Sequence, residues 1–145
     1  MRPMPKALAV AACLCAPPPA FAIGTCPSPV FFCKMEKSGK AVSVCETGSQ
    51  LTYEYGPLAG EAELVLSVER SSAIITPWNG MGSTYWSTLE IPNGDWSYML
   101  SVSYDRENSD DKGRGSLTVL RDGAERKRFG CIPETVAERI ESLAN

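Results

Sequence analysis

Polar and apolar residues alternate along most of the chain from residue 30 onward. This period of two is typical of half-buried β-strands, whereas helices repeat every 3.6 residues. In residues 61–68 the apolar Leu64, Leu66 and Val68 share one side, and Glu63 and Ser67 lie on the other. The pattern predicts strands with one solvent-exposed face at residues 30–36, 40–45, 50–55, 61–68, 84–91, 95–104, 116–121 and 124–129.

Turn residues separate these predicted strands. Asn93-Gly94 and Asp122-Gly123 supply the positive φ angles that tight hairpin turns require. Residues 38–40, Ser-Gly-Lys, indicate a further hairpin tip. About eight to nine short strands joined in this way predict an all-β fold, an antiparallel β-sandwich or barrel.

The C-terminus departs from the strand pattern. Pro133 opens a segment in which Val136, Ile140 and Leu143 are spaced at i, i+4 and i+7. Proline in the first turn and apolar residues at this spacing favour an amphipathic helix. We expect a short C-terminal helix over residues 134–143 that caps the sheet.

Residues 1–22 resemble an export signal. Arg2 and Lys6 precede an apolar run over residues 7–16, and residues 20–22, Ala-Phe-Ala, form an A-x-A cleavage site. The sequence therefore predicts a signal peptide over 1–22 and a single domain over 23–145, located in the periplasm or secreted. The alternative is a lipoprotein anchored at Cys13, since residues 10–13 resemble a lipoprotein cleavage box, although the apolar run before Cys13 is short for an export signal.

Removal of residues 1–22 leaves four cysteines in an oxidising compartment, where thiols pair. The chain has no C-x-x-C motif and no histidine, so structural disulfides are favoured over a metal site, and no metal or other cofactor is expected. Four cysteines allow three pairings. We expect Cys33 to pair with Cys45 across the hairpin tip at 38–40, and Cys26 to pair with Cys131.

Charge and composition narrow the function. The chain has a formal charge of −3, and without Arg2 and Lys6 residues 23–145 carry −5. Nucleic acid is therefore not an expected partner. No stretch after residue 22 approaches the roughly 20 apolar residues of a membrane-spanning helix.

The absence of histidine removes the commonest general base, and we expect no enzyme. Two carboxylates acting as a glycosidase pair are the remaining catalytic alternative, with Glu61 and Glu63, or Glu54 and Glu90, as partners across strands. The acidic residues within 105–111 are interpreted as a solvated loop, with calcium binding as the functional alternative.

The strongest candidate for a binding site is the breaker-rich segment over residues 76–83 and the strand after it. Alternation places Tyr85 inward and Trp86 on the polar face, while Trp96 and Tyr98 are expected in the core. Exposed aromatic and methionine side chains mark contact surfaces. The candidate partner-binding residues are Trp78, Met81, Gly82, Ser83, Tyr85 and Trp86. Burial of these aromatic residues would instead indicate a structural domain.

Several segments resemble a group of short exported bacterial proteins of unknown function. They are residues 32–45, with Cys33 and Cys45, Tyr55-Gly56-Pro57, the turn at 93–95 and residues 131–136. The likeness covers most of residues 23–145 and implies no activity.

A second resemblance is to the small β-sheet inhibitors that bacteria export against c-type lysozymes. In those proteins a Ser-Gly-x-x-Tyr loop enters the enzyme's cleft and a Leu-Thr-Val strand precedes a closing cysteine. Here Gly82-Ser83-Thr84-Tyr85 stands in the loop position, with serine and glycine reversed, and residues 116–119 precede Cys131. The resemblance implies a non-catalytic exported binding protein, with a basic protein such as lysozyme or another cell-wall hydrolase as its partner. The alternative is a structural envelope domain with no dedicated site.

Overall fold

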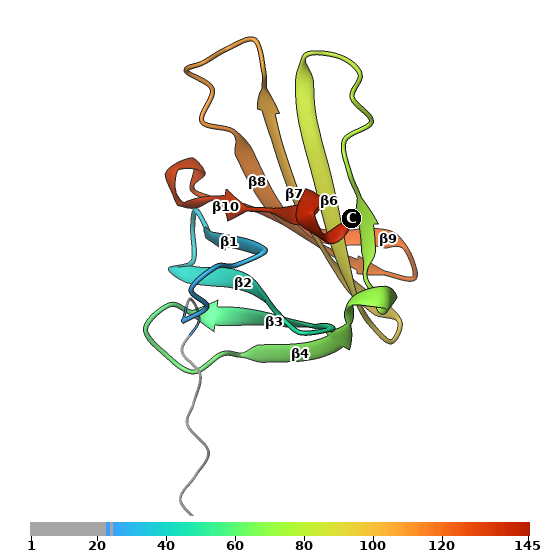
Figure 1. Ribbon diagram of the computed structural model, residues 1–145. Coiled ribbons are helices and arrows are strands. Elements are labelled where there is room, and N and C mark those ends of the chain that lie inside the picture. The colour runs from blue at the N-terminus through green and yellow to red at the C-terminus, as the bar shows by residue number, and fades with distance from the viewer. Residues whose placement is uncertain (1–22, 24) are drawn as a thin grey trace, which may run out of the picture.

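The computed structural model describes residue 23 and residues 25–145 (Figure 1). The expected signal peptide over 1–22 and the alternative lipid anchor at Cys13 lie outside the described residues. The described part is all-β, as predicted, and forms two antiparallel sheets of five strands each. Two strands had not been predicted, the three-residue β5 and the two-residue β10, because each is too short for alternation to be recognised.

The first sheet contains the N-terminal strands and one strand from the C-terminus. Its order is β10-β1-β2-β3-β4. The strands are β1 (Phe31–Lys34), β2 (Lys40–Thr47), β3 (Gln50–Pro57), β4 (Leu64–Glu69) and β10 (Ala137–Glu138). A 3-10 turn, η1 (Arg70–Ser72), leads from β4 into the second sheet.

The second sheet is formed by consecutive strands and has the order β5-β6-β7-β8-β9. The strands are β5 (Ile74–Thr76), β6 (Thr84–Asn93), β7 (Trp96–Asp105), β8 (Arg114–Arg121) and β9 (Ala124–Gly130). Two further 3-10 turns, η2 (Pro133–Thr135) and η3 (Ile140–Leu143), flank β10.

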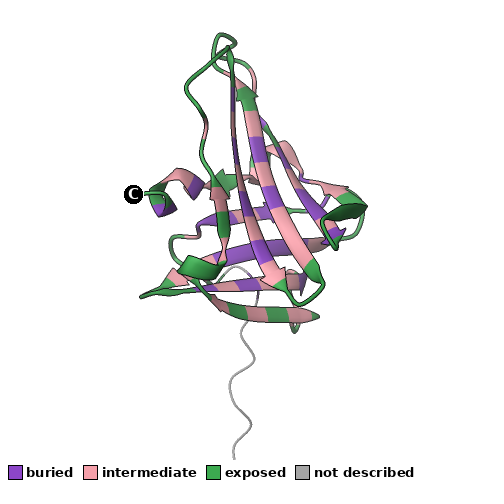
Figure 2. Ribbon diagram, turned by 90° about the vertical axis from the view of Figure 1, so that its right-hand side faces the viewer, coloured by how far each residue is buried: buried purple, intermediate pink, exposed green. Residues whose placement is uncertain are grey.

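The hydrophobic core lies between the two sheets, whose strands cross at a steep angle in Figure 1. Figure 2 shows the buried positions alternating with partly exposed ones along the long strands. Tyr53 of β3 stacks on Tyr98 of β7 with ring centres 5.0 Å apart, so aromatic contact joins the layers. Trp96 was also expected in the core, but it is 38% exposed. It is the first residue of β7 and lies next to the hairpin turn, where the guanidinium of Arg121 packs over its ring.

The predicted turn chemistry is confirmed at the β8–β9 hairpin. Asp122 and Gly123 have φ angles of 51° and 77°, as a type I′ turn requires. At the β6–β7 hairpin the register differs by one residue, because Asn93 pairs with Trp96 and the turn residues are Gly94 and Asp95. Gly94 has φ of 62°, so the glycine adopts the positive angle at the first turn position.

Two disulfides are present, but the predicted pairing was wrong. Cys33 is bonded to Cys131 and Cys26 to Cys45. In the β1–β2 ladder Cys33 lies opposite Val42, three residues from Cys45. An odd offset puts Cys45 on the other face of the sheet, and three residues span about 10 Å, beyond the reach of a disulfide.

The predicted C-terminal helix was also wrong, because this segment forms η2, β10 and η3 instead. Pro133 does begin a helical turn, and Ile140 and Leu143 are buried as their spacing suggested. However, β1 has a free edge, and β10 pairs with it through Phe31 and Glu138. A ten-residue helix gains little stability alone, so pairing with the sheet is favoured. No helix among the described residues is long and apolar enough to cross a membrane.

Candidate functional site

The candidate site lies at one end of the second sheet, where β6, β7 and β8 extend beyond the first sheet (Figure 1). Two loops form this projecting end: residues 77–83 before β6, and residues 106–113 between β7 and β8. Figure 2 shows both loops as largely exposed. We refer to these two loops and the adjoining strand ends as the projecting end.

The loop 77–83 is held in one conformation by its own polar groups. Trp78 donates its indole N–H to the carbonyl oxygen of Met81 at 3.2 Å, and Met81 donates its backbone N–H to Asn79 Oδ1 at 3.0 Å. Gly80 and Gly82 have φ angles of 79° and 82°, which residues other than glycine rarely adopt. Met81, between these two glycines, is 72% exposed.

Tyr85 supports this loop from below rather than lying on its surface. Tyr85 is only 8% exposed. Its ring stacks on that of Tyr104, with ring centres 4.6 Å apart, and the ring of Trp78 is tilted against it, with ring centres 5.9 Å apart. Its hydroxyl is 3.4 Å from Ser87 Oγ, and burial raises the pKa of the phenol. Tyr85 is therefore inward, as the alternation predicted, and cannot contact a partner directly.

Trp86 lies on the opposite face of β6 from Tyr85. It is half-buried and lies opposite Ser103 of β7, among the polar positions of the outer face. The structure therefore divides the predicted set: Trp78, Met81, Gly82 and Ser83 share the loop, Tyr85 is beneath it, and Trp86 faces away.

The second loop contributes residues that the sequence analysis did not single out. Arg106 places its guanidinium carbon 4.4 Å from the centre of the Trp78 ring, and its backbone N–H donates to the carbonyl oxygen of Ser83 at 2.9 Å. Tyr104, beside Tyr85, is 38% exposed. Alternation gave no signal for Arg106, since its contact with Trp78 depends on how two separate loops approach each other.

The acidic residues of this loop bind their own backbone. Asp111 accepts hydrogen bonds from the backbone N–H groups of Asp105 and Gly113, at 2.6 and 3.0 Å, and these bonds lower the pKa of its carboxyl. Within residue 23 and residues 25–145, no group of three potential metal-ligating side chains comes together. Glu107 and Asp110 are exposed, and so are Arg106 and Lys112 of the same loop.

Of the carboxylate pairs considered for glycosidase chemistry, Glu54 and Glu90 lie on different sheets. Glu54 is on β3 of the first sheet and Glu90 on β6 of the second, each at a position that alternates with buried residues and so faces outward. Burial raises the pKa of Glu54. Glu63 forms an ion pair with Lys40, with Nζ 2.9 Å from Oε2. The structure thus does not bring the pair Glu54 and Glu90 together.

No protein-family model, curated protein or solved structure matches this chain. The resemblances to exported proteins and to lysozyme inhibitors therefore stay predictions. Two disulfides and a β-sandwich-like fold are established by the structure, and the disulfides are typical of proteins in oxidising compartments.

Proposed function

We propose that the chain is an exported, non-catalytic binding protein that contacts a partner protein through its projecting end. The observation that carries the proposal is the exposure of Met81, an apolar side chain in a loop whose conformation is held by hydrogen bonds of Trp78 and Asn79. An apolar anchor held in place before binding loses little conformational entropy on association.

The net charge of the chain favours a basic partner. The chain has a formal charge of −3, and residues 23–145 carry −5. Complementary charge steers association and suppresses wrong partners. A c-type lysozyme or another basic cell-wall hydrolase has the required charge. Gly82 and Ser83 are exposed and resemble part of the inhibitor loop, which favours this class, whereas the buried Tyr85 does not take the role of the loop tyrosine.

The experiment is an inhibition assay with the purified protein. Lysis of bacterial cell walls by a c-type lysozyme should slow in its presence, and Met81→Asp should remove most of the effect, because a carboxylate would replace the apolar anchor. Val65→Asp is the matched control, since Val65 is also exposed but lies on β4 of the other sheet. Absence of inhibition and of binding with lysozymes and other cell-wall hydrolases would contradict the proposal.

The second candidate is a structural envelope domain without a dedicated site. It is favoured by the burial of Tyr85 and by the partial burial of Trp78 and Trp86, since the predicted aromatic patch is not fully displayed. This candidate predicts that Met81→Asp leaves every binding and envelope phenotype unchanged. Loss of a phenotype in cells that carry folded Met81→Asp protein would exclude it.

A further inference from the structure

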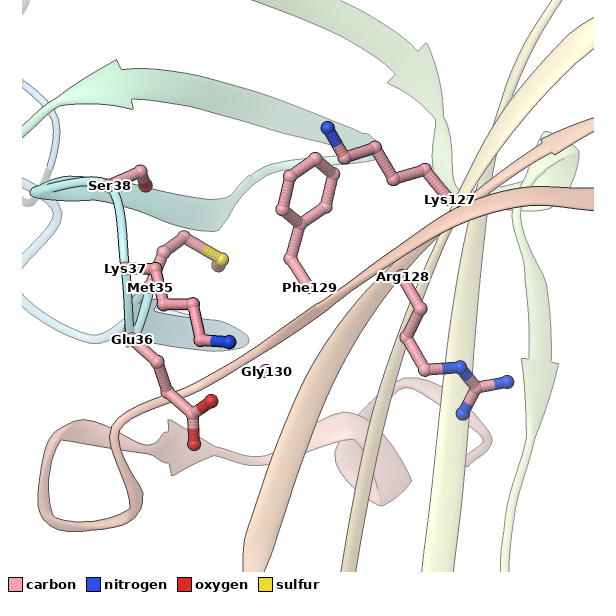
Figure 3. A pocket seen from close by; sticks show the side chains of 8 residues that line it. All are labelled: Met35, Glu36, Lys37, Ser38, Lys127, Arg128, Phe129 and Gly130. Atoms are coloured by element: carbon pink, nitrogen blue, oxygen red, sulfur yellow. The ribbon is translucent and has the colours of Figure 1, made fainter.

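A crevice of about 560 Å³ lies between the β1–β2 turn and the end of β9. Residues 35–38 form one side and residues 127–130 the other (Figure 3). The crevice shares no residue with the projecting end. Its volume lies within the range of about 300–1,000 Å³ that small-molecule sites occupy.

The inner part of the crevice is apolar. Met35 is 3% exposed and pairs through its backbone with Cys131, so it is fixed to the core. Phe129 is half-buried, and its ring lies 6.2 Å from that of Tyr55 on the first sheet. The half-buried phenyl ring of Phe129 provides an apolar surface on which an apolar chain can pack, and Met35 closes the floor beneath it.

Two ammonium groups stand at the rim. Figure 3 shows Lys37 and Lys127 on different sides of the Phe129 side chain, and Lys127 Nζ is 4.9 Å from the centre of that ring. Among the residues that the structure describes, neither lysine has a carboxylate oxygen within 4.0 Å. Arg128, in contrast, is paired with Glu125, with Nη2 2.7 Å from Oε2.

These charges are unusual in an acidic chain. Residues 126–128 are all basic, and Lys37 adds a fourth positive charge from another strand pair. Basic residues on an edge strand protect it from further pairing, which explains a charge on β9. That role does not explain why Lys37 and Lys127 flank an apolar crevice.

We propose that this crevice binds an amphipathic anion. The ammonium groups of Lys37 and Lys127 attract the carboxylate or phosphate head to the rim, and the apolar chain lies on the ring of Phe129. The carboxylate of Glu36 packs against Gly130, where a Cβ would be 2.8 Å from Oε2, and disfavours an anionic head at that end of the crevice. The site is independent of the proposed contact at Met81.

The experiment uses dodecanoate as the probe, below its micelle concentration, with ¹⁵N-labelled protein. Shifts of the backbone amides of residues 35–38 and 127–130 should saturate with dodecanoate. Acetate, which has the head alone, and dodecyl maltoside, which has the chain with a neutral head, should each give much weaker shifts. Equal shifts with either of these two ligands would overturn the proposal. Dodecyl phosphate in the same titration distinguishes a phosphate from a carboxylate head.

Charge variants locate the binding. The double variant Lys37→Gln with Lys127→Gln should bind dodecanoate about tenfold more weakly, the effect of two partly exposed ion pairs. Arg126→Gln removes a charge from the same strand at a residue that does not line the crevice, and should change affinity less than twofold. An unchanged affinity of the folded double variant would overturn the proposal. Binding to phosphatidylglycerol vesicles without binding of dodecanoate would also overturn it, and would indicate a membrane surface instead.

Discussion

The guanidinium of Arg106 lies over the indole ring of Trp78, 4.4 Å from its centre, although the two residues belong to different loops. The backbone N–H of Arg106 also donates to the carbonyl oxygen of Ser83. Each contact joins the loop 77–83 to the loop 106–113. The two loops therefore form one supported surface at the projecting end.

We expect Arg106→Ala to loosen the loop 77–83 while the fold persists. A cation over an indole contributes about 0.5–1 kcal/mol at an exposed site, so the free energy of unfolding should fall by no more than this. Trp78 should become more exposed, which moves its fluorescence emission to longer wavelength and increases quenching by iodide. Binding to the partner at Met81 should weaken, because the loop must then be ordered on association.

Arg121→Ala is the matched control for that variant. The guanidinium carbon of Arg121 lies 5.3 Å from the centre of the Trp96 ring. This contact is beside the β6–β7 and β8–β9 hairpins, at the far end of the strands from Trp78. It should expose Trp96 and leave partner binding unchanged. Equal loss of binding in both variants would contradict a specific role for the Arg106 contact.

The two disulfides should differ in their contribution to stability. Cys33 and Cys131 are 98 residues apart, and Cys26 and Cys45 are 19 apart. In the chain-entropy model the longer loop contributes about 4–5 kcal/mol and the shorter about 3 kcal/mol. Replacing Cys33 and Cys131 by alanine should therefore lower the free energy of unfolding more, measured by urea denaturation. Peptide mapping of the unreduced protein tests the pairing itself, and a Cys33–Cys45 peptide would contradict it.

Strands β3, β4 and β6 were predictable because one face of each packs toward the core, so their own sequences alternate with a period of two. Leu51 and Tyr53 are buried, and Tyr85 and Leu89 point inward as the alternation requires. The turn at Asp122 was predictable for a similar reason, since its φ is a local property. These features depend on residues close in sequence.

The disulfides, the C-terminal segment and the Arg106 contact could not be predicted, because each depends on residues distant in sequence. Cys33 meets Cys131 only after the two sheets pack. The segment 134–143 has a helical pattern, yet the free edge of β1 is what decides its conformation. The same holds for the candidate site. Met81 could be predicted from the sequence of its own loop, whereas Arg106 could not, because its contact with Trp78 joins two loops that are distant in sequence.

Gly115 is predicted to be required for packing of the Cys33–Cys131 disulfide. A Cβ at this position would lie 2.9 Å from Cys131 Sγ and 3.0 Å from Val136 Cγ2. Both distances are shorter than ordinary van der Waals contacts of a Cβ atom. Gly115→Ala should lower the free energy of unfolding by about 1–3 kcal/mol, as overpacking of a core does. Gly60→Ala is the control, since its Cβ would meet only Pro57 at 3.4 Å. Equal stability of the two variants in urea denaturation would contradict this close packing.

Asp111 should make the order of the loop 106–113 dependent on pH. Hydrogen bonds from the backbone N–H groups of Asp105 and Gly113 lower the pKa of its carboxyl, so the charged form is the one that holds the loop. These bonds are fully present above the ordinary aspartate pKa of about 3.9 and are lost as the pH falls through the lowered value. Asp111→Asn keeps one acceptor oxygen of the two, so the amides of Asp105 and Gly113 should exchange several-fold faster at neutral pH. Asp110→Asn changes an exposed carboxylate in the same loop and should leave these rates unchanged; equal rates in both variants would contradict the role of Asp111.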